Sequence, residues 1–547
     1  MNSARASSGQ LWCWLSVSLI VLGGSLSLAA FSNGWVVLSY KPSREIVYVW
    51  AGFELLLVLW IIAIAPWRPL NKVRAICIFC LFKTLLWMLI HVEGYYGDGR
   101  PMIAWRYDFS SHHFSLRDKQ ATVVKPSWGN ASDITHQPLD ETRPDIAYPG
   151  FRGADRTGVV QGVTLDTDWV TNPPELLWRR PLGAGWSSFA IIGNNAVTQE
   201  QQDDDEAVSC YDVLTGTEHW THRDPAHFRE VTGGEGPRAT PCIHEGRVYA
   251  LGATGILNCL DIADGKRLWS RNILHDAGVE NRIFGMAGSP MIVGEQVIVS
   301  PGGNNSTLTS YDAKTGNILW HGGDADASYS SPQRALFRHG EQIVIFHAAG
   351  LSGHDPHTGE TMWDYEWISQ PQERNNVCQP IPFPGTGDQP DRIFLSSGYG
   401  QGCALLELTS TKNRWLVKPQ WQNRNLKAKF SSVVLSNGFV YGMDEAILTC
   451  IDIRTGERRW KQGRYGYGQL ILVGDVLLIQ AEKGDVVLVA ADPHEFRELA
   501  RIPALDGRTW NHPALAGPYL MVRNDRDAVC FKLPVVKNER QSESIGP

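Results

Sequence analysis

The stretch Cys-Tyr-Asp-Val-Leu-Thr-Gly-Thr-Glu-His-Trp at residues 210–220 decides the fold, because the chain repeats its plan. Clear further copies occupy residues 259–269, 310–320, 353–363 and 450–460. In every copy the Asp stands eight residues before the Trp, and the Gly stands four before it. A fixed internal period of this kind predicts a repeat architecture in which each unit is one supersecondary motif.

Each recurring place in this phrase has a physical task. The residues that end at the Asp alternate as a strand does, and the Gly supplies the positive φ of a tight turn. We expect the Asp carboxylate to accept hydrogen bonds from turn amides and the Trp to bury its ring between neighbouring units. The structural positions are therefore Asp212, Gly216, Trp220, Asp261, Gly265, Trp269, Asp312, Gly316, Trp320, Asp355, Gly359, Trp363, Asp452, Gly456 and Trp460.

Two more strands precede each phrase, so each unit has four antiparallel strands, which is the build of a propeller blade. Degenerate copies lie at 403–415, where Glu407 takes the Asp place and Trp415 closes the phrase, and at 490–500, where Asp492 is present but Ala500 replaces Trp. An eighth unit is divided between the chain ends, with Trp178 on one strand and Cys530-Phe531-Lys532 on the strand before it. Joining them closes the ring and removes its open edges. The sequence therefore predicts an all-β, eight-bladed propeller.

The alternative WD40 propeller has a similar repeat length, but its Gly-His and Trp-Asp signature is absent here. The phrase instead resembles that of PQQ-repeat propellers, a group that includes quinoprotein alcohol and glucose dehydrogenases and the assembly lipoprotein BamB. The resemblance covers residues 147–534 and is specific for fold. The opening segment Tyr148–Gly158 is also similar to the entry segment of many bacterial PQQ-like propellers.

This resemblance implies two functions, an enzyme and a binding scaffold. A quinoprotein dehydrogenase needs a stacking Trp, a Ca²⁺ site and an Asp base, and many carry adjacent cysteines, which this sequence lacks. Candidates for the mouth of the central channel precede each first strand: Trp186, Arg238, Asn281, Asp324, Asp326, Asn375, Asn376, Lys429, Trp510 and Asn511. A solvated mouth with scattered polar residues also explains them. We predict a non-catalytic protein-interaction scaffold without a cofactor, with a PQQ- and Ca²⁺-dependent dehydrogenase of alcohols or sugars as the alternative.

Three apolar stretches precede the repeats, at Leu11–Phe31, Ile46–Ala65 and Val73–Val92. Each has about 20 residues, enough to span a bilayer as a helix, although a cleaved signal peptide is the alternative for the first. The basic residues between the second and third stretches favour a bacterial inner-membrane protein whose propeller faces the periplasm. Glu54 and Lys83 would lie at similar depth in antiparallel spans, so we expect them to pair.

The expected organisation is a three-helix anchor at 1–92, a linker at 93–146, the propeller at 147–534 and a disordered tail at 535–547. A formal net charge of −7 without a Lys/Arg block excludes a nucleic-acid partner. Envelope proteins or peptides are the expected partners. Cys210, Cys259, Cys450 and Cys530 recur at one repeat position, which is typical of a small buried filler. The spacing of Cys and His predicts no metal site.

Overall fold

The computed structural model describes residues 68–105, 146–367, 375–387, 389–411 and 414–536. The chain divides into two compact units, residues 1–113 and 114–547. In the first unit, helix α3 (Pro69–Leu89) is followed by a hairpin of β1 (Ile90–Tyr95) and β2 (Pro101–Trp105). The two apolar stretches before residue 67 lie outside the described residues.

The third apolar stretch ends earlier than predicted. Residues 90–92 belong to β1, where Ile90 pairs with Trp105 and Val92 with Ile103, so the hairpin's cross-strand pairs take them out of the helix. Part of the segment predicted as a linker is therefore a strand. None of the helices in the described part of the chain is both long and apolar enough to cross a membrane. Lys83 lies in α3, whereas Glu54 is outside the described residues, so their pairing stays a prediction.

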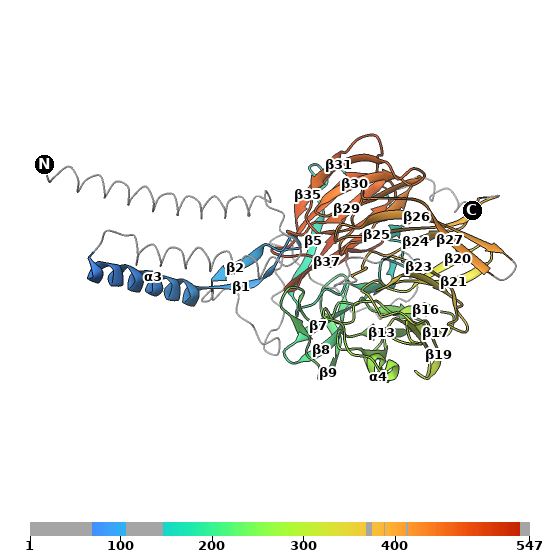
Figure 1. Cartoon of the computed structure of the whole chain (residues 1–547), viewed down its shortest axis with the longest axis horizontal. Coiled ribbons are helices and arrows are strands. Elements are labelled where there is room, and N and C mark those ends of the chain that lie inside the picture. Colours follow the sequence, from blue (N-terminus) through green and yellow to red (C-terminus); the bar gives the residue numbers. More distant parts are fainter. Residues whose placement is uncertain (1–67, 106–145, 368–374, 388, 412–413, 537–547) are drawn as a thin grey trace, which may run out of the picture. The chain divides into compact units, whose positions relative to one another are not determined.

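The second unit is the predicted propeller (Figure 1). Its described residues form eight sheets of four or five strands, numbered here as blades in chain order of their first strands. Blades 1 to 4 contain β6 (Ala190–Ile192), β7 (Asn195–Gln202), β8 (Asp205–Asp212), β9 (Glu218–Asp224); β12 (Cys242–His244), β13 (Arg247–Leu251), β14 (Ile256–Asp261), β15 (Arg267–Asn272); β16 (Met291–Val293), β17 (Gln296–Val299), β18 (Leu308–Asp312), β19 (Ile318–Gly322); and β20 (Gln333–Phe337), β21 (Gly340–His347), β22 (Gly350–His354), β23 (Thr361–Glu366).

Blades 5 to 8 continue this order. They contain β24 (Ile381–Phe383), β25 (Asp391–Ser397), β26 (Gly402–Thr411), β27 (Arg414–Asn423); β28 (Val434–Ser436), β29 (Phe439–Asp444), β30 (Ile447–Asp452), β31 (Arg458–Arg464); β32 (Gln469–Val473), β33 (Val476–Gln480), β34 (Asp485–Ala490), β35 (Glu498–Pro503); and β36 (Ala514–Ala516), β37 (Tyr519–Arg523), β38 (Asp527–Lys532), β5 (Glu175–Pro181). Short strand β3 (Ala147–Tyr148) is a fifth strand of blade 1, and β4 (Val159–Val160) is a fifth strand of blade 7. The connections between blades contain β10 (Arg229–Glu230), β11 (Gly234–Glu235) and helix α4 (Ile273–Ala277).

The core lies between neighbouring blades. In blade 7, every residue of β32 and β33 is buried, whereas the outer strand β35 has only exposed and half-buried residues. The inner strands are covered on both faces by adjacent sheets, and for this reason they are nearly continuous in Val, Leu and Ile. The outer strands reach solvent and admit charged residues.

The ring closes where the sequence predicts it. Cys530 on β38 pairs with Trp178 on β5, so two segments more than three hundred residues apart complete blade 8. Figure 1 shows the cyan β5 among the red strands of the C-terminal part. The predicted tail begins too early, because Val535 bridges to Leu165 and the Val536 amide donates to the Thr164 carbonyl. Residues 537–547 are outside the described residues.

The prediction is wrong for the Trp of the first degenerate copy. Trp415 pairs with Ser410 near the end of a long hairpin, whereas Trp421 pairs with Leu405 at the usual Trp position. Strands β26 and β27 have ten residues each, so the extended hairpin displaces the Trp by six positions.

The prediction is confirmed for the Trp place of the second degenerate copy. Ala500 lies opposite Leu488, beside a bulge like the one next to each phrase Trp. Strand β34 nevertheless ends at Ala490, so Asp492 lies two residues beyond the place where a phrase Asp ends its strand.

Candidate functional site

The repeated phrase joins most blades to the next. The Trp178 ring covers Gly216, Trp220 covers Gly265, Trp269 covers Gly316, Trp320 covers Gly359 and Trp421 covers Gly456. Blade 5 has no phrase Gly for the Trp363 ring to cover, because Ser410-Thr411 replace Thr-Gly in its copy of the phrase.

The indole N–H groups add hydrogen bonds to this packing. In several blades the N–H donates to the carbonyl just after the next phrase Asp, as from Trp220 to Ile262 O at 2.7 Å and from Trp269 to Ala313 O at 3.0 Å. Trp460 likewise reaches the turn of blade 7, donating to Asp492 O at 2.8 Å. In blades 3 and 4 the bond stays within the blade, from Trp320 to Gln296 and from Trp363 to Gln342.

The phrase Asp closes the turn. Asp312 Oδ1 accepts hydrogen bonds from the amides of Lys314 and Thr315 and from the Thr315 hydroxyl. The hydroxyl bond is the main reason why the pKa of Asp312 lies below its usual value. Asp212 and Asp355 repeat all three bonds, while Asp261 and Asp452 accept from the amide two residues on. These five carboxylates act within their own turns.

A belt of hydrogen bonds joins blades 1 to 6 around the channel, where their first strands begin. A backbone amide of one blade donates to a side-chain oxygen of the next, as from Thr240 to Ser289 Oγ and from Ser289 to Ser331 Oγ, both at 2.9 Å. The belt continues through Ser188, Gln379 and Ser432. It fixes the spacing of the blades around the central axis.

The entry segment Tyr148–Gly158 crosses the ring and ties blades together. Arg152 is buried and its Nη2 donates to Val433 O in blade 6, while Arg156 donates to Ser289 O and Pro290 O in blade 3. The Gly158 carbonyl accepts from the Leu472 amide in blade 7. The motif that the sequence singles out as an entry segment is therefore a plug across the ring.

At the channel mouth, meaning the residues just before the first strands, two tryptophans and an arginine pack together. The Arg508 guanidinium lies 4.7 Å from the Trp186 ring centre and 4.5 Å from the Trp510 ring centre. The two rings are 5.0 Å apart at their centroids. The Trp510 N–H donates to Glu482, and Arg508 also lies 3.6 Å from Asp525. A cation within about 6 Å of two indole rings is attracted by both of them.

Lys429 occupies a second cationic position at the mouth. Its Nζ lies 5.0 Å from the Tyr467 ring centre and 5.3 Å from that of Tyr399. Phe430 stacks on Tyr467 at 5.0 Å and contacts Trp510 at 4.8 Å, which connects this group with the Trp186–Arg508 group. The structure thus brings Trp186, Lys429 and Trp510 together in one aromatic and cationic cluster.

Arg238 extends this cluster toward blade 3. Its side chain donates to the carbonyls of Phe284 and Gly234 and lies over the Phe228 ring at 4.5 Å. Burial lowers the pKa of Arg238 to about 10, which still leaves the group charged at neutral pH.

The other predicted mouth residues have different positions. Asn281 donates to Ala253 O, and the buried amides of Asn376 and Asn511 donate to carbonyls of the channel wall, so these three tie the backbone together. Asn375 is buried, whereas Asp324 and Asp326 are not; Asp324 lines a separate cavity between blades 3 and 4.

Sequence reasoning missed Arg508, Phe430 and Tyr467. A usable signal existed for the aromatic positions, because the tripeptide aromatic-Ser-Ser recurs at 186–188, 329–331 and 430–432. Its serines build the belt, so its aromatic residue must face the mouth. Arg508 carries no such signal, since only the folded chain places it against the two tryptophans.

The Arg508 guanidinium lies close to both Trp186 and Trp510, so a flat quinone ring could stack only on an indole face that Arg508 leaves open. Within the described residues, no group of three or more His, Cys, Asp or Glu side chains is placed to hold a metal ion. Eight cysteines are described, and all of them, including Cys378 and Cys403, are free thiols.

A family model described as outer membrane protein assembly factor BamB matches residues 147–299 and 204–462. The chain belongs to this family. BamB of Shewanella oneidensis is 21% identical over 299 residues, which cover 52% of this chain and 71% of that protein. A 1-butanol dehydrogenase (cytochrome c) of Thauera butanivorans is 30% identical over 116 residues, which cover 19% of this chain and only 16% of the dehydrogenase.

Solved structures support the BamB-type propeller fold. A europium-containing methanol dehydrogenase superposes with a TM-score of 0.55 at 12% identity, covering 72% of this chain and 99% of that one. The quinohemoprotein alcohol dehydrogenase of Comamonas testosteroni gives 0.53 at 14% identity, covering 73% and 82%. At such identities the likeness establishes the fold alone.

Proposed function

We propose that this BamB-family chain is a non-catalytic scaffold that holds envelope proteins or peptides on its propeller. One observation carries this proposal: Arg508 packs against both Trp186 and Trp510, whose rings also contact each other. The mouth is thus a preformed surface of aromatic rings and cations, and Trp, Tyr and Arg are the residues enriched at protein-binding hot spots. The residues of the repeated phrase support this proposal, because their side chains are engaged in holding turns and blades together.

A cofactor titration tests the proposal directly. The purified full chain is mixed with PQQ and Ca²⁺, heat of binding is recorded, and dye-linked oxidation of alcohols and sugars is followed. We expect neither saturable binding nor turnover. Stoichiometric quinone binding with substrate-dependent dye reduction would establish the dehydrogenase alternative, which the local similarity to 1-butanol dehydrogenase favours.

The scaffold function needs a positive test as well. Photo-crosslinking from position 186 in bacterial envelopes should yield discrete protein adducts, because Trp186 is half-buried and borders the mouth. The same crosslinker at Val170, which is 96% exposed and away from the mouth residues, is the matched control. Equal adducts from both positions would contradict a partner site at the mouth.

We also propose that the N-terminal apolar segments anchor the chain in the inner membrane with the propeller in the periplasm. Their length and flanking charges support this. Membrane fractionation after carbonate washing, and protease digestion of spheroplasts, test the anchor and its orientation. Release by carbonate, or protection of the propeller in intact spheroplasts, would refute it.

A further inference from the structure

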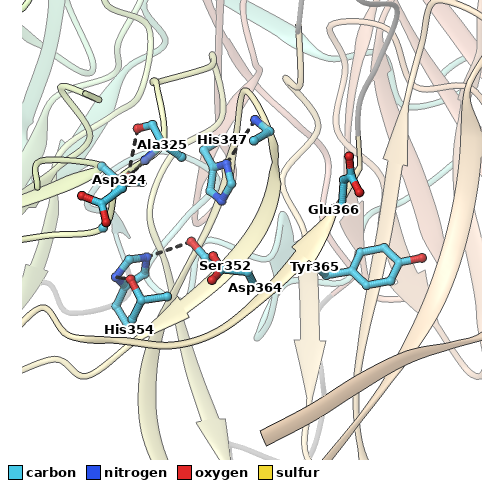
Figure 2. Close-up of a pocket in the computed structure, with 12 residues that line it drawn as sticks. Asp324, Ala325, His347, Ser352, His354, Asp364, Tyr365 and Glu366 are labelled. Carbon is cyan, nitrogen blue, oxygen red and sulfur yellow. Dashed lines mark hydrogen bonds between the residues drawn. The ribbon is translucent and has the colours of Figure 1, made fainter. Parts of the chain in front are cut away.

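A polar cavity lies between blades 3 and 4, apart from the mouth cluster. Its volume is about 390 Å³, and its wall includes Asp324 from blade 3 and His347, Ser352, His354, Asp364 and Glu366 from blade 4. Figure 2 shows His347, Ser352 and His354 around one space, with Asp324 beside it. The contacts of the repeated phrase and the hydrogen bonds of the belt do not need a cavity at this place.

The wall is acidic. Asp364 and Glu366 stand two residues apart on β23, so they project from the same face of the strand. Burial, together with nearby Asp324, raises the pKa of Asp364, although His354 opposes this shift. Among the described lining residues there is no Lys or Arg, and no described residue forms an ion pair with these three carboxylates.

Both ring nitrogens of His354 already have hydrogen-bond partners. Its Nδ1 lies 3.0 Å from the Gly359 carbonyl and must donate to it, so its Nε2 accepts from the Ser352 hydroxyl at 2.8 Å. The Ser352 oxygen keeps free lone pairs on the side of the cavity. In other copies this phrase position holds Tyr211, Leu260, Tyr311 or Ile451, so the His is a local departure from the repeat.

One ring nitrogen of His347 lacks a hydrogen-bond partner among the described residues. Its Nδ1 accepts from the Ala349 amide at 3.2 Å, which leaves the proton on Nε2. The side chain belongs to a residue only 4% exposed, and Nε2 has no hydrogen-bond partner among the described residues. A buried donor without an acceptor is destabilising, so a ligand atom that accepts this bond gains affinity. Burial also lowers the pKa of His347 to about 4, which keeps the ring neutral.

We propose that this cavity binds an organic ammonium ion that also carries a neutral hydroxyl or carbonyl oxygen. The carboxylates of Asp324 and Asp364 accept from the ammonium group, and the neutral oxygen accepts from His347 Nε2. The site is separate from the mouth, so the proposal holds whether or not the propeller is a scaffold. The same chemistry occurs in an amino sugar and in a lysine side chain with its peptide carbonyl.

Calorimetry on the full chain tests the two halves of this recognition. The probes are glucosamine, glucose, which lacks the ammonium group, and cyclohexylamine, which lacks the oxygen. We expect saturable binding of glucosamine with a Kd of about 1 mM, as suits a small ligand, and at least tenfold weaker binding of the other two. Equal binding of glucose, no binding of any amine, or displacement of glucosamine by equimolar CaCl₂ would overturn the proposal.

Substitutions show where the ligand binds, and a peptide probe distinguishes a lysine side chain from an amino sugar as the natural ligand. D364N should weaken binding at least tenfold, whereas D204N, which removes an exposed carboxylate on blade 1, should not. H347F should abolish the preference for glucosamine over cyclohexylamine while both still bind. An N-acetylated Gly-Lys-Gly amide that binds more tightly than glucosamine, and is lost in D364N, identifies a peptide lysine as the source. Unchanged binding in D364N would refute this location, and circular dichroism confirms that each variant folds.

Discussion

At the scale of single residues, each phrase glycine meets two demands. Gly316 has a φ of 72°, and a Cβ there would lie 2.7 Å from Cδ2 of Trp269. The residue must adopt a left-handed conformation and must also leave room for the neighbouring indole. The sequence pattern indicates only the first demand, because the ring comes from another blade.

The glycine argument yields a matched pair of substitutions in blade 3. Gly294 has a φ of 59°, and a Cβ at this position would meet no neighbouring atom within 4 Å, so G294A adds strain alone, about 1 kcal/mol. G316A adds strain and displaces Trp269, so its cost should be two to three times larger, roughly 2–3 kcal/mol. Thermal unfolding of both variants checks this. Equal melting temperatures would show that the indole contact contributes nothing.

A second residue-scale prediction concerns acid. The pKa of His347 falls from 6.5 to about 4 on folding because burial opposes its charge. The unfolded chain therefore binds a proton between these values and the folded chain does not, so stability falls as pH drops from about 6.5 toward 4. At pH 5 the cost is on the order of 2 kcal/mol.

The variant H347Q isolates that contribution. It cannot titrate, so its melting temperature should fall less than that of the native protein between pH 7.5 and pH 5. Comparing the two proteins cancels the other groups, such as Glu206, whose pKa burial raises and which acts in the opposite direction. An identical loss in both proteins would show that His347 is protonated in the folded state.

At the scale of elements, the two tryptophans of blade 5 exchange the roles expected of them. The Trp421 indole donates to Ile453 O at 2.9 Å and covers Gly456, whereas Trp415 contacts His339 near the end of the β26–β27 hairpin. W421F should cost about 1 kcal/mol, because it leaves a carbonyl of the neighbouring turn without its donor. W415F should cost less than half as much. Chemical denaturation compares them, and a larger effect at Trp415 would mean that blades 5 and 6 are joined elsewhere.

At the scale of the whole molecule, one antiparallel strand pair closes the ring. Strand β38 pairs with β5, and Val535 and Val536 bind residues 165 and 164 beyond it. A chain that stops at residue 526 lacks β38 and leaves the edges of β37 and β5 unpaired. It should aggregate or lose its cooperative transition, while a chain that stops at residue 536 keeps every described strand and should melt as the full chain does. A soluble, cooperatively folded 526-residue chain would contradict closure as a source of stability.

The local phrase determined the fold. Asp–Thr-Gly–Trp spacing, strand alternation and the divided eighth unit predict eight blades and their closure, because turn chemistry and strand period are properties of neighbouring residues. Where a hairpin is longer, as before Trp421, the spacing predicts the wrong Trp. The number of residues between two positions no longer tells which of them pair in the sheet. Only the tertiary structure placed Arg508 against Trp186 and Trp510, threaded Arg152 and Arg156 across the ring, and left His347 Nε2 beside an acidic cavity. Each of these depends on side chains from different blades that meet around a closed ring, and contacts between distant segments leave no period in the sequence.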